Sequence, residues 1–68
     1  MSISVTLNGK QTVLEKTETI GDLLREKGLE HNRVVVEVNR NIIKQDQFEQ
    51  FTIKNRDKVE VLRFVGGG

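Results

Sequence analysis

Polar and apolar side chains alternate along residues 2–7, and the dipeptide Asn8-Gly9 follows directly. Alternation with a period of two places all the apolar side chains on one face of a β-strand. Asn-Gly favours a two-residue hairpin turn, because both residues tolerate the positive φ angles that such a turn requires. We therefore predict an antiparallel hairpin in which residues 11–16 form the returning strand, with Leu14 facing the interior.

A short helix is predicted over residues 20–27. Thr19 is a suitable N-cap, and Asp22 three residues later gives an acidic variant of the capping box. Gly28 can adopt the left-handed conformation that often ends a helix. A helix this short is stable only when its apolar face packs against the rest of the protein. The face expected in the core is formed by Ile20, Leu23 and Leu24.

Three further strands are expected after the helix. Residues 33–38 carry valines on both faces, which is typical of an interior strand. Phe48 and Phe51 are expected to fill the core from a segment that is irregular or forms one helical turn. The expected segments are a strand at 33–38, a turn at 39–41, a strand at 42–43, the irregular segment at 47–51, a turn at 55–57 and a strand at 58–65.

The order hairpin, helix, strand, irregular crossing and strand predicts an α+β fold. In a β-grasp, the fold of ubiquitin-like proteins, a mixed sheet of four to five strands packs on one main helix. The first and last strands would then pair in parallel at the centre of this sheet. The expected domain is residues 1–65, and residues 66–68 are expected to form a flexible glycine tail.

Composition excludes several classes of function. A chain of 68 residues folds as one domain whose core is too small to enclose a deep active site. A net charge of +1 and only three aromatic residues, all Phe, argue against a nucleic-acid-binding surface. The chain has no Cys, and its single histidine, His31, lacks a nucleophile to activate. No apolar run is long enough to span a membrane, so we expect a cytoplasmic protein.

The C-terminal glycines are the least ordinary feature of the sequence. Three of the six glycines follow the last apolar strand directly, as Gly66, Gly67 and Gly68. Because glycine has no side chain, such a segment could pass through a channel too narrow for other residues. The α-carboxylate of Gly68 is ionised at pH 7 and resists nucleophilic attack. It would therefore have to be activated before it could react, for instance as a mixed anhydride with AMP.

With these motifs in order, the chain resembles the ThiS-type sulfur carriers of thiamine biosynthesis. The motifs that carry the resemblance are Asn8-Gly9-Lys10, Thr19-Ile20, Leu23-Leu24, Val34 to Asn39, Asp57-Lys58-Val59-Glu60-Val61 and Phe64-Val65-Gly66-Gly67-Gly68. The chain departs from the family at two turns that commonly carry Gly, where it has Arg40 and Arg56. It also has Lys44 where a Pro is frequent.

The resemblance implies that the chain is a carrier and not an enzyme. An E1-like adenylyltransferase would use ATP to adenylate Gly68, and a cysteine desulfurase would supply the sulfur. The resulting thiocarboxylate would donate sulfur to a thiazole synthase. Gly66 and Gly67 would thread the partner's channel, and Phe64 or Val65 would contribute to docking. No bound cofactor or metal is expected.

Other functions remain compatible with the sequence. Carriers for molybdopterin synthesis and for tRNA thiolation share the fold and the Gly-Gly end. A ubiquitin-like modifier would instead join Gly68 to lysines of target proteins. A passive β-grasp interaction domain is a third alternative.

Overall fold

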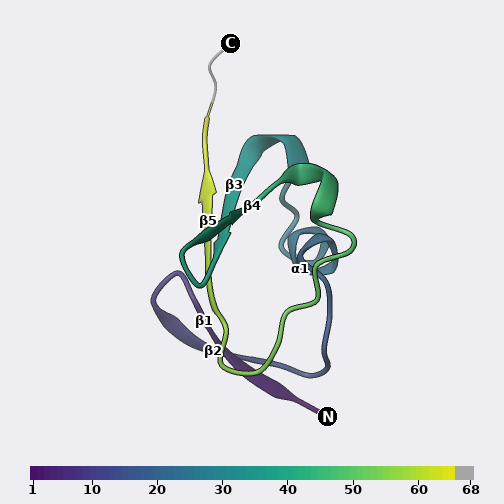
Figure 1. The fold of residues 1–68 in the computed structure, drawn as a ribbon, viewed down its shortest axis with the longest axis vertical. Helices are drawn as coiled ribbons and strands as arrows, with labels where there is room; N and C mark the ends of the chain where they lie inside the picture. Colours follow the sequence, from purple (N-terminus) through teal and green to yellow (C-terminus); the bar gives the residue numbers. More distant parts are fainter. Residues whose placement is uncertain (66–68) are drawn as a thin grey trace.

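The computed structural model describes residues 1–65. Its elements, in chain order, are β1 (Ile3–Leu7), β2 (Lys10–Leu14), α1 (Ile20–Glu26), the 3-10 helix η1 (His31–Arg33), β3 (Val34–Val38), β4 (Asn41–Ile43), the 3-10 helix η2 (Gln45–Gln47) and β5 (Lys58–Arg63). Figure 1 shows α1 on one side of the sheet, with the segment between β4 and β5 passing close to it.

The five strands form one mixed sheet in the order β2-β1-β5-β3-β4. The first and last strands, β1 and β5, pair in parallel, and every other neighbouring pair is antiparallel. The sheet and the one α-helix found within residues 1–65 confirm the predicted β-grasp. They place β5 at the centre of the sheet, so the strand that leads to the C-terminal glycines is supported on both sides.

The first hairpin has the predicted two-residue turn. Asn8 and Gly9 have φ angles of 48° and 83°, and Leu7 pairs with Lys10 across the turn. The returning strand is shorter than predicted, because it ends at Leu14, which lies opposite the first residue of β1. Leu14 is buried and its neighbour Val13 is exposed, as expected.

The helix begins at the predicted cap. The Thr19 hydroxyl accepts a hydrogen bond from the Asp22 amide, and the Asp22 carboxylate accepts one from the Thr19 amide. This reciprocal capping box satisfies two amides that the first turn would otherwise leave unpaired. The helix ends one residue earlier than predicted, with Lys27 as its C-cap, and Gly28 follows with a φ of 70°.

The core lies between α1 and the sheet. Phe48 enters it from the segment after η2, as predicted, and Phe51 is only partly buried. Ile53 is fully buried and was not expected, because it lies in an irregular segment without periodicity. The buried apolar residues are Val5, Leu14, Ile20, Leu23, Leu24, Val34, Val36, Val38, Phe48, Ile53 and Val59.

The two turns that depart from the family pattern keep a conformation suited to glycine. Arg40 and Arg56 have φ angles of 72° and 73°, in the left-handed region that disfavours a side chain. Asn39 and Arg40 alone form the turn between β3 and β4, so Asn41 belongs to β4 and not to the predicted turn.

The boundaries of two later strands also differ from prediction. Arg33 ends η1, so β3 begins at Val34, and β5 ends at Arg63 instead of Val65. Both differences have one cause, since Val34 pairs with Arg63 at the last position of the β3–β5 ladder. Among the helices that the structure describes, none has the length and apolar character needed to cross a membrane.

Candidate functional site

The strand β5 leads to the predicted functional site, the chain end at Gly68, and ends at Arg63. Beyond the last ladder pair, the Phe64 amide still donates a hydrogen bond of 3.0 Å to the Arg33 carbonyl. On the side facing β3, the central strand β5 and its extension are therefore hydrogen-bonded as far as Phe64. This anchoring fixes the direction in which the chain leaves the sheet.

On its other side, β5 is held by Asn8. Its amide donates to the Val59 carbonyl at 2.9 Å, and its side-chain oxygen accepts a hydrogen bond of 2.8 Å from the Val61 amide. The Asn8 side-chain amide also donates to the Val61 carbonyl at 3.3 Å. Asn8 thus shapes the hairpin turn and extends the parallel pairing of β1 with β5 by two residues.

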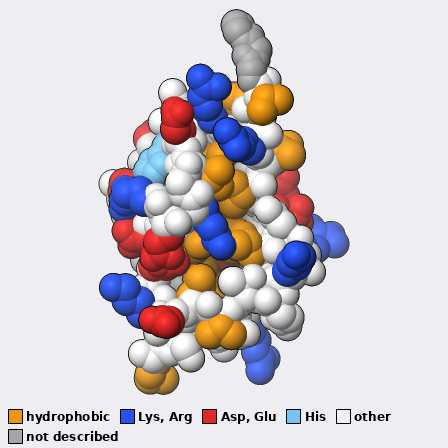
Figure 2. Space-filling model, turned by 180° about the vertical axis from the view of Figure 1, so that it is seen from behind, with side chains coloured by type: hydrophobic (Ala, Val, Ile, Leu, Met, Phe, Trp, Pro, Cys, Tyr) orange, Lys and Arg blue, Asp and Glu red, His pale blue; other side chains and the backbone are white. Residues whose placement is uncertain are grey.

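Large apolar side chains are exposed where the described chain ends. Phe64 and Val65 are 50% and 81% exposed. Figure 2 shows apolar side chains at the surface next to the point where the described residues stop. Leu62 lies opposite Val35 on the sheet face away from α1, and both side chains are exposed. Phe64, two residues beyond Leu62, continues this face, so the sheet surface beside the chain end is apolar.

Two carboxylates lie directly opposite each other on this outer sheet face. Glu37 of β3 is the cross-strand partner of Glu60 of β5. Like charges in this position repel each other and destabilise the sheet. The Lys58 ammonium lies 4.0 Å from the Glu60 carboxylate and offsets only part of this repulsion. A pair of this kind is well suited to receive a positive charge from another protein.

Predictions for the three terminal glycines lie outside the described residues. Gly66, Gly67 and Gly68 are the residues for which we predicted threading and activation, and these roles stay predictions. The structure does place Phe64 and Val65 at the surface, as docking would require.

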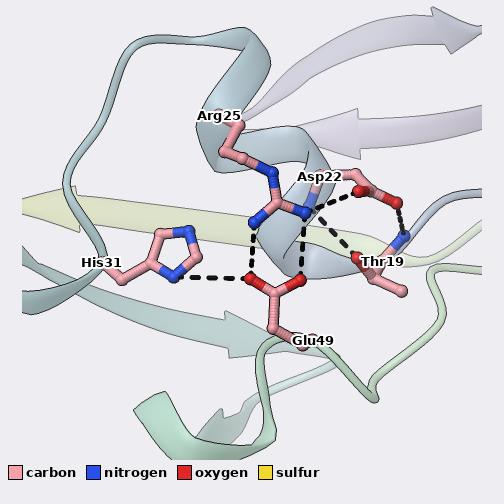
Figure 3. Close-up of polar contacts among 5 residues, drawn as sticks. All are labelled: Thr19, Asp22, Arg25, His31 and Glu49. Carbon is pink, nitrogen blue, oxygen red and sulfur yellow. Dashed lines mark hydrogen bonds and ion pairs between the residues drawn. The ribbon is translucent and has the colours of Figure 1, made fainter.

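A polar cluster joins α1 to the segment after η2 (Figure 3). Arg25 donates two hydrogen bonds to the Glu49 carboxylate, at 2.6 and 3.0 Å, and one to Asp22 at 2.7 Å. The Arg25 hydrogen bonds lower the pKa of Glu49, and the Thr19 amide is the main cause that lowers the pKa of Asp22. His31 packs edge-on against Phe48, with ring centroids 5.6 Å apart. The cluster ties the segment after η2 to the helix.

Sequence reasoning missed a buried carboxyl group at Glu18. The residue is 7% exposed, and its Oε2 atom is buried without a hydrogen-bond partner. Burial is the main cause that raises the pKa of Glu18 to about 7, and the nearby Glu26 carboxylate adds to it because it can accept a hydrogen bond only from the protonated form of Glu18. No sequence signal marks this burial, because Glu18 lies in a polar loop and is covered only by tertiary contacts.

The described residues offer no metal site. Residues 1–65 contain no group of three or more His, Asp or Glu side chains placed to hold a metal ion. The Glu49 carboxylate is already engaged, because it accepts two hydrogen bonds from Arg25.

Comparison with known proteins identifies the family. The sequence model of the ThiS family matches residues 4–68. The sulfur carrier protein ThiS of Bacillus subtilis is 43% identical over 63 residues, which cover 91% of this chain and 96% of that protein. The crystal structure of the thiamine biosynthesis protein ThiS from Geobacter metallireducens superposes with a TM-score of 0.82 at 30% identity, covering 97% of this chain and all of that one.

A thiazole synthase also contains a similar segment. The thiazole synthase of Paramagnetospirillum magneticum is 30% identical over 66 residues, which cover 97% of this chain but only 20% of that enzyme. The family model, the Bacillus relative and the Geobacter structure agree with one another and with the β-grasp geometry. The chain therefore belongs to the ThiS family and is a sulfur carrier of thiamine biosynthesis, not a catalyst.

Proposed function

We propose that the chain carries sulfur as a thiocarboxylate on Gly68 and delivers it to a thiazole synthase. The observation that carries this proposal is the match of the ThiS family model to residues 4–68, a range that includes the terminal glycines. The exposed side chains of Phe64 and Val65, which follow the central strand β5, add to it. A thiazole synthase that contains a segment similar to this chain supports the choice of acceptor.

The chemistry requires activation before sulfur transfer. Attack of the Gly68 carboxylate on ATP forms an acyl adenylate and releases pyrophosphate. A persulfide then attacks the acyl carbon and AMP leaves, which gives an acyl disulfide. A thiol cleaves the S–S bond, forming a new disulfide and releasing the thiocarboxylate. The chain has no Cys, so partners must supply every thiol.

These steps assign three partners. An E1-like adenylyltransferase binds the ATP and forms the adenylate, a cysteine desulfurase supplies the persulfide, and the thiazole synthase receives the sulfur. The carrier itself needs no cofactor. Because ATP and these enzymes are cytoplasmic in this scheme, the carrier acts in the cytoplasm.

Docking uses the outer sheet face beside the chain end. Its exposed apolar side chains offer contact area, and the opposed carboxylates Glu37 and Glu60 offer a place for a basic side chain. Replacing Phe64 by Ser removes apolar contact without emptying the core, because Phe64 is half exposed. The variant is expected to slow adenylation and to keep the unfolding midpoint of the parent protein.

The decisive experiment is an intact-mass measurement. The full chain is incubated with a ThiS-activating adenylyltransferase, ATP, a cysteine desulfurase and cysteine. Replacement of one oxygen by sulfur supports the proposal, and attachment to a lysine of another protein would support a ubiquitin-like modifier instead. An unchanged mass, with an adenylyltransferase that activates the Bacillus carrier, would leave only a passive domain.

A chain extended by one Trp after Gly68 is the matched control. It lacks the terminal glycine carboxylate, so it is expected to gain no sulfur. Its urea unfolding curve should coincide with that of the parent chain, which would show that the loss lies in the chemistry and not in folding.

A further inference from the structure

A groove opens between β2 and α1, away from the outer sheet face. Three β2 side chains point toward the helix, and of these only Leu14 is buried, whereas Lys10 is exposed and Thr12 is partly buried. The hydrophobic core therefore covers the C-terminal end of β2, at Leu14, but not its start. The groove has a volume of about 500 Å³, and its apolar lining is formed by Leu7, Leu23, Leu24, Leu29 and Val61.

Two lysines border the groove. Lys10 at the start of β2 and Lys27 at the end of α1 both line it and are exposed. Neither forms an ion pair with any residue in the range 1–65. Figure 2 shows a strip of apolar side chains at the surface with Lys and Arg side chains along its borders.

The charge changes sign along β2. Beyond Leu14, the neighbouring pocket is lined by acidic side chains, Glu15, Glu18 and Glu26, with Lys16 as its one basic residue. A segment lying along β2 would therefore meet positive charge at the Lys10 end and mostly negative charge at the other. A ligand that lies along β2 should therefore carry negative charge near Lys10 and positive charge near the acidic end.

The backbone of β2 is available for pairing. Within the described residues β2 has only β1 as a neighbour, so its other edge is free. Because Leu7 and Lys10 flank a two-residue turn, alternation leaves the amides and carbonyls of Gln11 and Val13 facing away from β1. The opposite edge strand, β4, has only three residues and offers a shorter template.

We propose that this groove binds an extended segment of a partner protein, which adds to the edge of β2. The segment places an apolar side chain in the groove, carboxylates beside Lys10 and Lys27, and a basic side chain at the acidic end. Backbone pairing supplies affinity, and the alternate side chains supply specificity. The surface is distinct from the outer sheet face and from the chain end, so one carrier could hold this segment while its terminus reacts.

A second copy of the chain fits the groove less well. Antiparallel pairing of two β2 strands through Gln11 and Val13 would bring Thr12 opposite Thr12. No apolar side chain would then enter the groove beside them, and the lining would stay in contact with water. The partner segment is therefore the occupant that the groove favours.

The test is an NMR titration of the full ¹⁵N-labelled chain. The probe is the peptide acetyl-Asp-Asp-Val-Ile-Val-Gly-Lys-amide, used with its reversed sequence because both strand directions are possible. One of the two is expected to shift the amides of Gln11, Val13 and Lys27. A peptide with Lys in place of both Asp residues should bind about fivefold to tenfold more weakly, as the loss of two exposed ion pairs implies.

Charge reversal provides the matched variants. Lys10→Glu with Lys27→Glu is expected to weaken binding of the acidic peptide by about tenfold or more. Lys44→Glu with Lys54→Glu makes the same change in net charge at exposed lysines outside the groove and should leave binding within about twofold. All variants alter exposed side chains, and their unfolding midpoints report whether the fold is kept.

Three results would overturn the proposal. These are the absence of shifts with either peptide, shifts centred on the outer face at Val35 and Leu62, and equal binding by both charge-reversed variants. Shifts that depend on protein concentration without peptide would assign the groove to a second copy. The titration needs no activating enzyme, so its outcome is independent of the chemistry proposed for Gly68.

Discussion

Replacing Glu18 by Gln should make the protein more stable at neutral and alkaline pH and leave its stability at low pH unchanged. The Oε2 atom of Glu18 is buried and unpaired, and Glu26 lies close enough to accept a hydrogen bond once Glu18 is protonated. Asp22 adds repulsion and Lys16 offsets part of it, while Glu15 lines the same pocket. The neutral form of Glu18 is therefore the form that fits the folded protein.

The sign of the effect follows from proton binding. Burial raises the pKa of Glu18 from 4.5 to about 7, so between these values the folded state holds a proton that the unfolded chain has lost. The free energy of unfolding then falls as pH rises from about 4.5 to about 7, and levels off above that. The pKa difference corresponds to about 3 kcal/mol at most. Solvent in the pocket beside Glu18 screens the repulsion, so we expect about 1–3 kcal/mol.

Urea unfolding of parent and variant from pH 4 to pH 8 measures this difference. Gln at position 18 can donate to Glu26 at every pH, so its advantage should grow between pH 4.5 and pH 7. Glu15→Gln is the matched control, because Glu15 lines the same pocket but is exposed, and its curve should stay parallel to that of the parent. Parallel curves for Glu18→Gln and the parent would refute the reasoning, since they would show that Glu18 titrates normally in the folded protein.

Three other substitutions test the local structure. Arg56→Gly removes the side chain from a residue in the left-handed conformation, so urea titration should show a free energy of unfolding higher by up to about 1 kcal/mol. A lower free energy of unfolding would mean that the Arg56 side chain makes a contact that outweighs the backbone strain. Lys44→Pro fits a residue with a φ of −73° and should add about 0.4–1 kcal/mol, and a lower thermal midpoint would contradict this. Thr19→Ala removes the capping box and should lower the free energy of unfolding by about 1 kcal/mol. The circular dichroism signal at 222 nm should then be lost at a lower temperature, whereas an unchanged thermal midpoint would show that the cap is dispensable.

The sequence predicted best where a short-range rule decides the conformation. Asn8-Gly9 determined the first hairpin because its positive φ angles are accessible to these two residues. Thr19 and Asp22 located the start of the helix because each satisfies the other's backbone amide. The strand ends were less accurate, because β2 stops where β1 has no further residue to pair with, and that limit is set by pairing and not by composition.

Tertiary contacts explain what the sequence could not predict. Arg25 and Glu49 are 24 residues apart, and only the packed fold brings them together. Ile53 and Glu18 meet through a backbone hydrogen bond of 2.8 Å between the Ile53 amide and the Glu18 carbonyl. Neither local propensity nor periodicity reports such pairings, so the burial of Ile53 and Glu18 became visible only in the structure.

The fold also bears on the proposal that the carrier presents its chain end to several enzymes. The central strand is held on one side by β3 as far as Phe64, and on the other by Asn8 only as far as Val61. The hydrogen bonds to the central strand therefore end earlier on the side of β1 than on the side of β3. They end beside exposed apolar side chains and not inside a pocket. Because the strand direction is fixed by the sheet, a partner that binds the outer face finds the C-terminal residues starting from a defined position. In the function proposed for Gly68, docking on this face would bring the reactive group to the partner, and the carrier itself would need no catalytic side chain.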